Sequence, residues 1–214
     1  MAKFELPPIY PVTSRELSGL AHAEQVRQLA DAGCRFVQIR EKSASSRDFY
    51  KYVVESLAIA RKFGMKVIVN DRIDVAIAAG ADGVHLGQED MSPGFARELL
   101  GSDAIIGYST HSVEQAIEAL SMPIDYIAVG PVFATSTKQN PDPVIGIDGI
   151  SAIRAATGSI KIVAIGGITI DNVAEVIRAG ADSAAVISDL YRDPQEIAPR
   201  YAAIEASASI VKQS

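Results

Sequence analysis

Eight short runs rich in valine and isoleucine recur along the chain, and they limit its fold more than any other feature. Most are continuously apolar rather than alternating between apolar and polar residues, which is typical of strands covered on both faces. Strands of that kind belong to parallel sheets. We expect them at residues 9–13, 36–40, 66–70, 83–86, 105–109, 126–130, 161–166 and 183–188.

Helical patterns lie between these runs. Apolar residues repeat at spacings of three and four over residues 21–32, 46–63, 113–120 and 173–179, with charged residues on the opposite face. Glycine closes three of the helix-to-strand junctions, where it can take the left-handed backbone of a helix end.

Strand–helix units with short connections predict one α/β domain over residues 1–214. Eight such units favour a closed (β/α)8 TIM barrel. An open doubly wound sheet is the alternative, because a miscount of one or two strands would change the prediction.

Composition narrows the possible partners and compartments. The 214 residues are 48% hydrophobic and 21% charged, which is typical of a soluble globular protein. A formal net charge of -6 provides no field that would attract nucleic acid. The single cysteine, Cys34, allows no internal disulfide and favours a reducing, cytoplasmic setting. We expect no signal peptide and no membrane span, because Glu5 and two prolines interrupt the start and no run of eighteen apolar residues occurs.

The residues at the predicted carboxyl ends of the strands are unusually polar, and in a (β/α)8 barrel these ends form the active site. In the second strand, alternation points Gln38, Arg40 and Lys42 to the same side, which we expect to be the barrel mouth. The ends of the following strands carry Asn70, Asp71, Asp90, Ser109, His111, Thr135, Ser136, Thr137 and Lys138.

Cationic side chains facing two aspartates suggest that an anionic phosphate binds together with a divalent cation. Asp71 and Asp90 supply the one or two carboxylates that Mg²⁺ takes beside phosphate oxygens. Arg40, Lys42 and Lys138 would clamp the phosphate. The alternative for each residue is an ordinary surface ion pair, but their occurrence at several strand ends favours a site.

A second anion site is predicted after the last two strands. Gly166 and Gly167 allow backbone N–H groups to approach an anion, and Ile187 and Ser188 follow the eighth strand. The alternative is that the glycine pair forms only a tight turn.

The histidines and the cysteine admit other interpretations. His111 is either a general acid or base or a cap of the helix that follows. His85 is expected in the core or the pocket wall, His22 at the surface, and Cys34 in the packing at the opposite end of the barrel.

Together these motifs resemble the thiamine-phosphate synthase family over nearly the whole chain. They comprise Gln-x-Arg-x-Lys at 38–42, Asn-Asp at 70–71, Gly-Gln-x-Asp at 87–90, Ser109, Thr-x-Thr-Lys at 135–138, Gly-Gly at 166–167 and Ile-Ser at 187–188. The resemblance implies that 4-amino-2-methyl-5-hydroxymethylpyrimidine diphosphate is condensed with a thiazole or carboxythiazole ethyl phosphate. The expected products are thiamine phosphate and pyrophosphate.

The resemblance also implies a role for each motif. The pyrimidine diphosphate would be bound by Gln38, Arg40, Lys42, Asn70, Ser109 and Lys138, of which Arg40, Lys42, Ser109 and Lys138 would be catalytic. Asp71 and Asp90 would hold Mg²⁺. The thiazole phosphate would be held by Thr135, Ser136, Thr137, Gly167, Ile187 and Ser188.

Three other functions remain as alternatives. A homologous thiazole tautomerase would not need Arg40, Lys42 and the aspartates. A sugar-phosphate isomerase or epimerase could use Asp71 as its base. A silent binding module would leave the charged residues without a use. The chain has the size of barrels that often self-associate through their helices, but the sequence indicates no interface.

Overall fold

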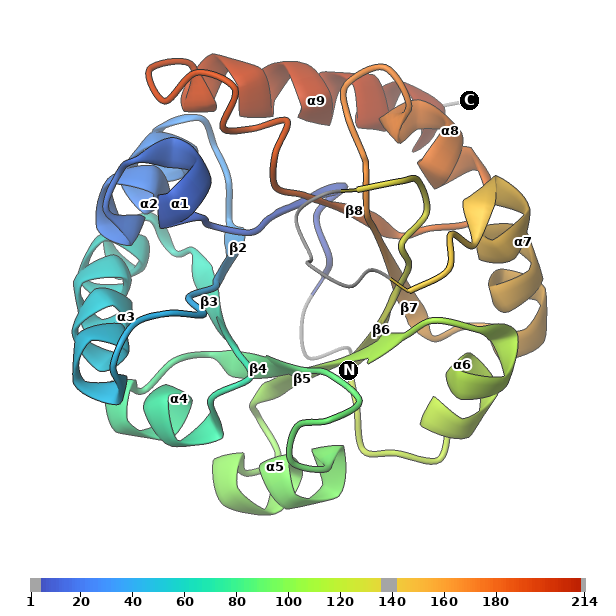
Figure 1. Cartoon of the computed structure of the whole chain (residues 1–214), viewed down its shortest axis with the longest axis horizontal. Coiled ribbons are helices and arrows are strands. Elements are labelled where there is room, and N and C mark those ends of the chain that lie inside the picture. The colour runs from blue at the N-terminus through green and yellow to red at the C-terminus, as the bar shows by residue number, and fades with distance from the viewer. Residues whose placement is uncertain (1–4, 136–141, 213–214) are drawn as a thin grey trace.

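The computed structural model describes residues 5–135 and 142–212, with side chains through residue 209. Its strands form one parallel sheet in the order β1-β8-β7-β6-β5-β4-β3-β2. A bridge between Val12 and Gln38 joins the first strand to the second and closes the ring. The protein is a (β/α)8 barrel, as the sequence predicts, and Figure 1 looks into the ring of strands inside its helices.

Each predicted strand is present, and most end one or two residues earlier than predicted. The strands are β1 Ile9–Pro11, β2 Phe36–Ile39, β3 Lys66–Asn70, β4 Gly83–Leu86, β5 Ile105–Thr110, β6 Tyr126–Val129, β7 Lys161–Ile165 and β8 Ser183–Val186. Arg40, Gly166 and Ser188 therefore lie just beyond the hydrogen-bonded ladder. At these positions the chain has left the sheet, so it can direct side chains and N–H groups toward the barrel mouth.

The four predicted helices are α2 His22–Asp31, α3 Ser46–Ala60 with a 3-10 turn η1 Arg61–Phe63, α6 Val113–Ala119 and α8 Val173–Arg178. The structure adds α1 Arg15–Ser18, α4 Ile73–Ala79, α5 Pro93–Leu100, α7 Gly146–Thr157 and α9 Ile197–Lys212. The helices form the outer ring, and α9 packs between α2 and α8 to complete it (Figure 1). Within the described ranges, no helix is both long and apolar enough to cross a membrane.

The core has two layers. The larger layer fills the space between strands and helices and includes Cys34, which confirms its predicted packing role. The smaller layer lies inside the barrel, where the rings of Tyr10 and Phe36 meet in a T-shaped arrangement with centroids 4.7 Å apart. Gly107 leaves room for Tyr126 there, because a Cβ at that glycine would lie 2.0 Å from the tyrosine ring. These aromatic side chains form the floor of the site above them.

Candidate active site

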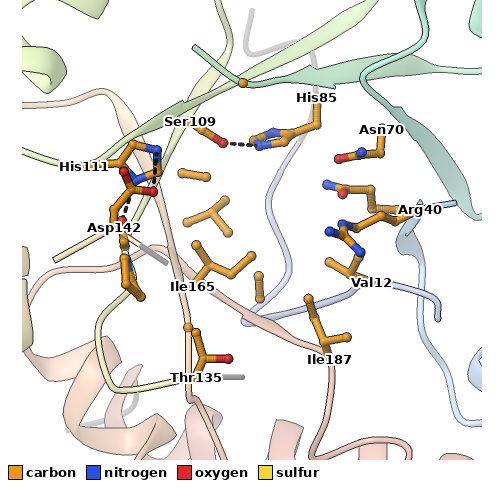
Figure 2. Close-up of a pocket in the computed structure, with 18 of the residues that line it drawn as sticks. Val12, Arg40, Asn70, His85, Ser109, His111, Thr135, Asp142, Ile165 and Ile187 are labelled. Atoms are coloured by element: carbon orange, nitrogen blue, oxygen red, sulfur yellow. Dashed lines mark hydrogen bonds and ion pairs between the residues drawn. The ribbon is translucent and has the colours of Figure 1, made fainter. Parts of the chain in front are cut away.

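One pocket of about 820 Å³ opens at the carboxyl ends of the strands. Every site residue predicted within the described ranges lines it: Gln38, Arg40, Lys42, Asn70, Asp71, Asp90, Ser109, Thr135, Gly167, Ile187 and Ser188. Ser136, Thr137 and Lys138 lie outside the described residues. Figure 2 shows Arg40 and Asn70 on one side of the pocket and Thr135 with Asp142 on the other.

The loop after β2 is held from beneath, which directs its cations into the pocket. The hydroxyl of Thr13 accepts the N–H of Arg40 at 3.3 Å, and the Glu41 carboxylate accepts the N–H groups of Lys42 and Ser43 at 2.9 and 3.0 Å. Burial tends to raise the pKa of Glu41, but the Ser43 hydrogen bonds outweigh it and lower that pKa overall. Glu41 therefore stays ionised and anchors the loop while Arg40 and Lys42 line the pocket.

His22 lies under this same loop, so its predicted surface position is wrong. It is 1% exposed, and its Nδ1 is 2.8 Å from the Thr13 hydroxyl. Its Nε2 is 3.6 Å from Glu41. The periodicity of α2 could not show that its first turn packs against the end of β1, where a hydroxyl offers a partner. Burial lowers the pKa of His22 to about 4, although Glu41 opposes the shift.

Two carboxylates, from Asp71 and Asp90, stand at the ends of neighbouring strands. Lys42 Nζ is 2.5 Å from Asp71 Oδ2, and Asp90 Oδ2 accepts the Gly87 N–H at 2.7 Å. Burial, together with the charge of Asp71, raises the pKa of Asp90. The backbone of Asp71 has a φ of 61°, a left-handed conformation that is uncommon outside glycine and clusters at functional sites.

This pair matches the chemistry of a magnesium site that is completed by substrate. Two nearby carboxylates repel each other, and a divalent cation relieves that repulsion. Mg²⁺ commonly takes one or two carboxylates plus phosphate oxygens. Among the described residues, no group of three or more histidines, cysteines or acids could form an all-protein metal cage.

Asn70 supplies an unpaired donor on this side of the pocket. Its side chain is 6% exposed, and its Nδ2 has no hydrogen-bond partner among the described residues. A buried amide without a partner is costly, so such a group in a pocket indicates an acceptor on the ligand.

The opposite side of the pocket is built from backbone. Gly166 and Gly167 have φ values of 104° and 65°, and both are packed too tightly for a side chain. A Cβ at Gly167 would lie 2.7 Å from Phe133 and 2.8 Å from the carbonyl oxygen of Ala134. The glycine pair therefore lets the loop after β7 lie directly against the segment that leads to Thr135.

Asp189, which the sequence analysis missed, joins the two loops of this side. Its buried carboxylate accepts the N–H of Ile170 from the β7 loop at 3.1 Å. It also pairs with Arg200 of α9 at 2.7 Å and with Arg192. The loops after β7 and β8 are thus fixed to each other and to α9.

Between the two sides, five side chains form a hydrogen-bond chain inside the barrel: Gln38, Tyr10, Tyr126, His85 and Ser109. The His85–Ser109 link is drawn in Figure 2. His85 is buried with both ring nitrogens bonded, which confirms the wall position predicted for it. Burial lowers its pKa to about 4, and Asp71 opposes that shift. Strand alternation could have revealed this chain, because its members lie on inward-facing positions.

His111 does not cap α6, because the cap is Ser112, whose hydroxyl accepts the Gln115 N–H at 3.2 Å. The imidazole instead bridges two loops. Its Nδ1 is 2.6 Å from the carbonyl oxygen of Gly130, and its Nε2 is 3.5 Å from Asp142 (Figure 2). Asp142 also lines the pocket and carried no signal in the sequence.

Known proteins share both this fold and the motifs at its mouth. The family model for thiamine monophosphate synthase matches residues 9–190. The chain belongs to this family. A thiamine-phosphate synthase from Chloroflexus aurantiacus is 46% identical over 181 residues, which cover 84% of this chain and 83% of that one. One from Koribacter versatilis is 42% identical and covers 92% and 95%.

Solved structures agree with this assignment. Thiamine phosphate pyrophosphorylase from Pyrococcus furiosus superimposes with a TM-score of 0.86 at 34% identity, covering 98% of both chains. A structure described as native KDPGal superimposes with a TM-score of 0.76 at 20% identity, which shows the shared barrel alone.

Membership in the family establishes the reaction class. The chain is a thiamine-phosphate synthase, a transferase that acts on small phosphorylated substrates in thiamine biosynthesis. It joins a pyrimidine diphosphate to a thiazole phosphate and releases pyrophosphate. The tautomerase, the isomerase and the silent module are therefore set aside.

Proposed function

We propose that the two sides of the pocket divide the two substrates between them. The observation that carries this proposal is a single cavity of about 820 Å³ with cations and carboxylates on one side and a glycine-built loop on the other. The pyrimidine diphosphate lies on the charged side, against Gln38, Arg40, Lys42, Asn70 and Ser109, and the thiazole phosphate lies on the backbone side, against Thr135, Gly167, Ile187 and Ser188. From the motif outside the described residues, Lys138 also binds the diphosphate, and Ser136 and Thr137 also bind the thiazole phosphate.

Arg40 and Lys42, together with Lys138, bind the diphosphate and stabilise it as it leaves. Charge on the departing pyrophosphate grows in the transition state, and fixed cations aimed at that charge lower the barrier. The anchored β2 loop supports this role, because Thr13 and Glu41 hold the backbone that carries both cations.

Asp71 and Asp90 are the residues that would hold Mg²⁺ against the diphosphate. Bound there, the ion neutralises charge on the leaving group. Lys42 already pairs with Asp71, so the cation and the carboxylate that serve the same phosphate are held together in advance.

The remaining residues orient the reacting partners. An aminopyrimidine stabilises positive charge at its exocyclic carbon, so the bond to the diphosphate breaks before the thiazole nitrogen attacks. Gln38, Asn70 and Ser109 hold the pyrimidine ring. The backbone side holds the thiazole so that its nitrogen faces the exocyclic carbon, opposite the departing diphosphate. This alignment supplies the orientation that a reaction between two substrates needs. No covalent nucleophile is required.

Two broader features also belong to the proposal. The cytoplasm is the expected compartment, because its reducing conditions suit a chain whose single cysteine is buried.

Self-association through the outer helices is expected of a small barrel. Sedimentation over a range of concentrations measures it, and a constant monomer mass would contradict it.

The direct test follows pyrophosphate release from the purified protein. We expect release only when the pyrimidine diphosphate, the thiazole phosphate and Mg²⁺ are all present, with thiamine phosphate as the second product. A chelator should abolish release, and added Mg²⁺ should restore it. Release that continues at full rate without the metal would contradict the assignment of Asp71 and Asp90.

A further inference from the structure

The pairing between β4 and β5 ends before it reaches Ser109. The last two residues in register are Leu86 and Tyr108. The main-chain groups of successive residues in a strand point to opposite neighbours. The Thr110 carbonyl faces β6, because it accepts the Gly130 N–H at 3.3 Å. The Ser109 carbonyl therefore faces the β4 side, where the strand has already ended.

Gln88 reaches this carbonyl with its side chain. In a parallel ladder, a carbonyl accepts the N–H of the residue that follows its register partner. Ile105 pairs with Gly83, so the same register continued along both strands would pair Ser109 with Gly87. The regular donor to the Ser109 carbonyl would then be the main-chain N–H of Gln88. The chain turns after Gly87 instead, and Gln88 Nε2 donates to that carbonyl at 2.5 Å.

The turn that contains Gln88 is closed around the carboxylate of Asp90. Asp90 Oδ2 accepts the Gly87 N–H at 2.7 Å, and the Asp90 N–H donates to the Gly87 carbonyl at 3.3 Å. The carboxylate is therefore fixed within its own turn. Its direction relative to Asp71 then depends on how the whole turn is held against the barrel, and the Gln88 amide ties that turn to β5.

We propose that Gln88 is a positioning residue for the carboxylate pair of Asp71 and Asp90. The inference rests on the proposed function, in which these two carboxylates hold Mg²⁺ against the diphosphate. Two neighbouring carboxylates repel each other, so the Asp90 turn has to be held in place before a cation arrives. The Gln88 hydrogen bond does this, and it fixes the main chain of Ser109 in the same pocket.

A single exposed hydrogen bond matters here because of the metal's geometry. Such a bond contributes little to the stability of the whole protein. Mg²⁺, however, demands a nearly ideal octahedral arrangement of its oxygen ligands. A small displacement of the Asp90 turn therefore weakens metal binding while the fold remains intact.

Gln88→Met tests the role, because it keeps the length of the side chain and removes the donor. The first measurement is the dissociation constant of Mn²⁺, which takes the same oxygen ligands as Mg²⁺ and is followed by electron paramagnetic resonance. It should rise about fivefold, which corresponds to the loss of one hydrogen bond. The KM of the thiazole phosphate and the free energy of unfolding should stay at their wild-type values.

Hydrogen exchange of the metal-free protein provides a second measurement. The Gly87 N–H is held by the Asp90 carboxylate, so it reports on the turn itself. Its exchange should be about fivefold faster in Gln88→Met than in the wild type. Gln28→Met is the matched control for both measurements, because Gln28 Nε2 also donates to a main-chain carbonyl, that of Pro194, and Gln28 does not line the pocket.

Two results would overturn the proposal. The first is an unchanged Mn²⁺ dissociation constant in Gln88→Met. The second is weaker Mn²⁺ binding with unchanged exchange of the Gly87 N–H, because that combination would make Gln88 a metal ligand rather than a positioning residue.

These outcomes are separable from those of the proposed function. A wild-type protein that binds no Mn²⁺ and releases pyrophosphate without a metal would count against the assignment of Asp71 and Asp90. Intact metal binding in the wild type, with the same dissociation constant in Gln88→Met, would count against Gln88 alone.

Discussion

The two sides of the pocket are built from different chemical groups. The side formed by β2, β3 and β4 uses ionisable side chains, represented by Arg40, Lys42 and Asp71. The side formed by β7 and β8 uses glycine backbone at Gly166 and Gly167, stiffened by the buried Asp189.

The difference has a physical reason in the proposed chemistry. A diphosphate that leaves during the reaction gains charge in the transition state, and preorganised cations beside a metal site stabilise that added charge. A phosphate that only anchors its substrate keeps a constant charge, so a rigid backbone is sufficient. We therefore expect mutations on the charged side to affect turnover and mutations on the backbone side to affect binding.

The largest effect is expected from removing a cation on the charged side. Arg40→Ala should lower kcat/KM for the pyrimidine diphosphate by about 10²–10³-fold, because a preorganised charge is lost where charge develops. The KM of the thiazole phosphate should stay close to the wild-type value. Steady-state kinetics with each substrate varied measures both quantities.

A cation at the other end of the barrel provides the control for Arg40. Lys66 pairs with Asp82 at 2.7 Å where β3 begins, and Lys66→Ala should leave turnover unchanged. Equal losses for both substrates in Arg40→Ala would remove the distinction between the two sides.

The backbone side should respond to a single methyl group. Gly167→Ala adds a Cβ that collides with Phe133 and the Ala134 carbonyl, at a position where φ is already left-handed. We expect the KM of the thiazole phosphate to rise about tenfold to a hundredfold, with kcat much less affected. Gly158→Ala is the control, because it has the same φ of 65° with nothing within 4 Å of the added carbon. A lower kcat with no change in KM would contradict the prediction.

Lowering the pH should reduce the free energy of unfolding through His22, which lies under the β2 loop of the charged side. Its folded-state pKa of about 4 lies below the unfolded value of 6.5, so the unfolded chain binds the proton first as pH falls. The stability contributed by the neutral imidazole is present above pH 6.5 and is lost between 6.5 and 4. At pH 5 the loss from His22 amounts to about 2 kcal/mol of unfolding free energy.

Denaturant unfolding at pH 7.5 and pH 5 measures this loss. His22→Gln cannot titrate, so its free energy of unfolding should fall by about 2 kcal/mol less than that of the wild type between the two conditions. Identical pH dependence in the two proteins would show that the buried histidine does not support the β2 loop in the manner described.

The smallest effect is expected from neutralising one carboxylate. Asp71→Asn keeps a residue that tolerates the left-handed backbone and removes one of two negative charges. The Mg²⁺ concentration for half-maximal activity should rise about tenfold, because fewer charged ligands remain. Asp74→Asn is the control, since Asp74 pairs with Arg72 and does not line the pocket. An unchanged metal titration would remove Asp71 from the ligand set.

Local pattern was enough to predict much of the site. Continuous apolar runs located the strands, and alternation placed Gln38, Arg40 and Lys42 on one face. The rule that barrels carry their sites at strand ends then placed polar residues from different strands in one pocket. These inferences depend only on the neighbours of each residue along the chain.

The features that sequence reasoning missed depend on partners distant in the chain. His22 is buried because Thr13 and Glu41 meet it from two other segments. Asp142 reaches His111 across two loops, and no spacing connects them. In the sequence, Asp189 is only one more polar residue after a strand, and nothing there indicates its partner. The structure shows that Arg200 of α9 pairs with it.

The sequence by itself determined the positions of the strands, favoured the barrel over an open sheet and indicated the residue types at its mouth, because periodicity and strand-end position are local properties. Only the tertiary structure decided which of those residues touch. It closed β1 on β2 and brought the Gln38 and Ser109 walls into one hydrogen-bond chain through Tyr126. Hydrogen bonds and ion pairs act over a few ångströms, so their partners are fixed only when the ring of strands has formed.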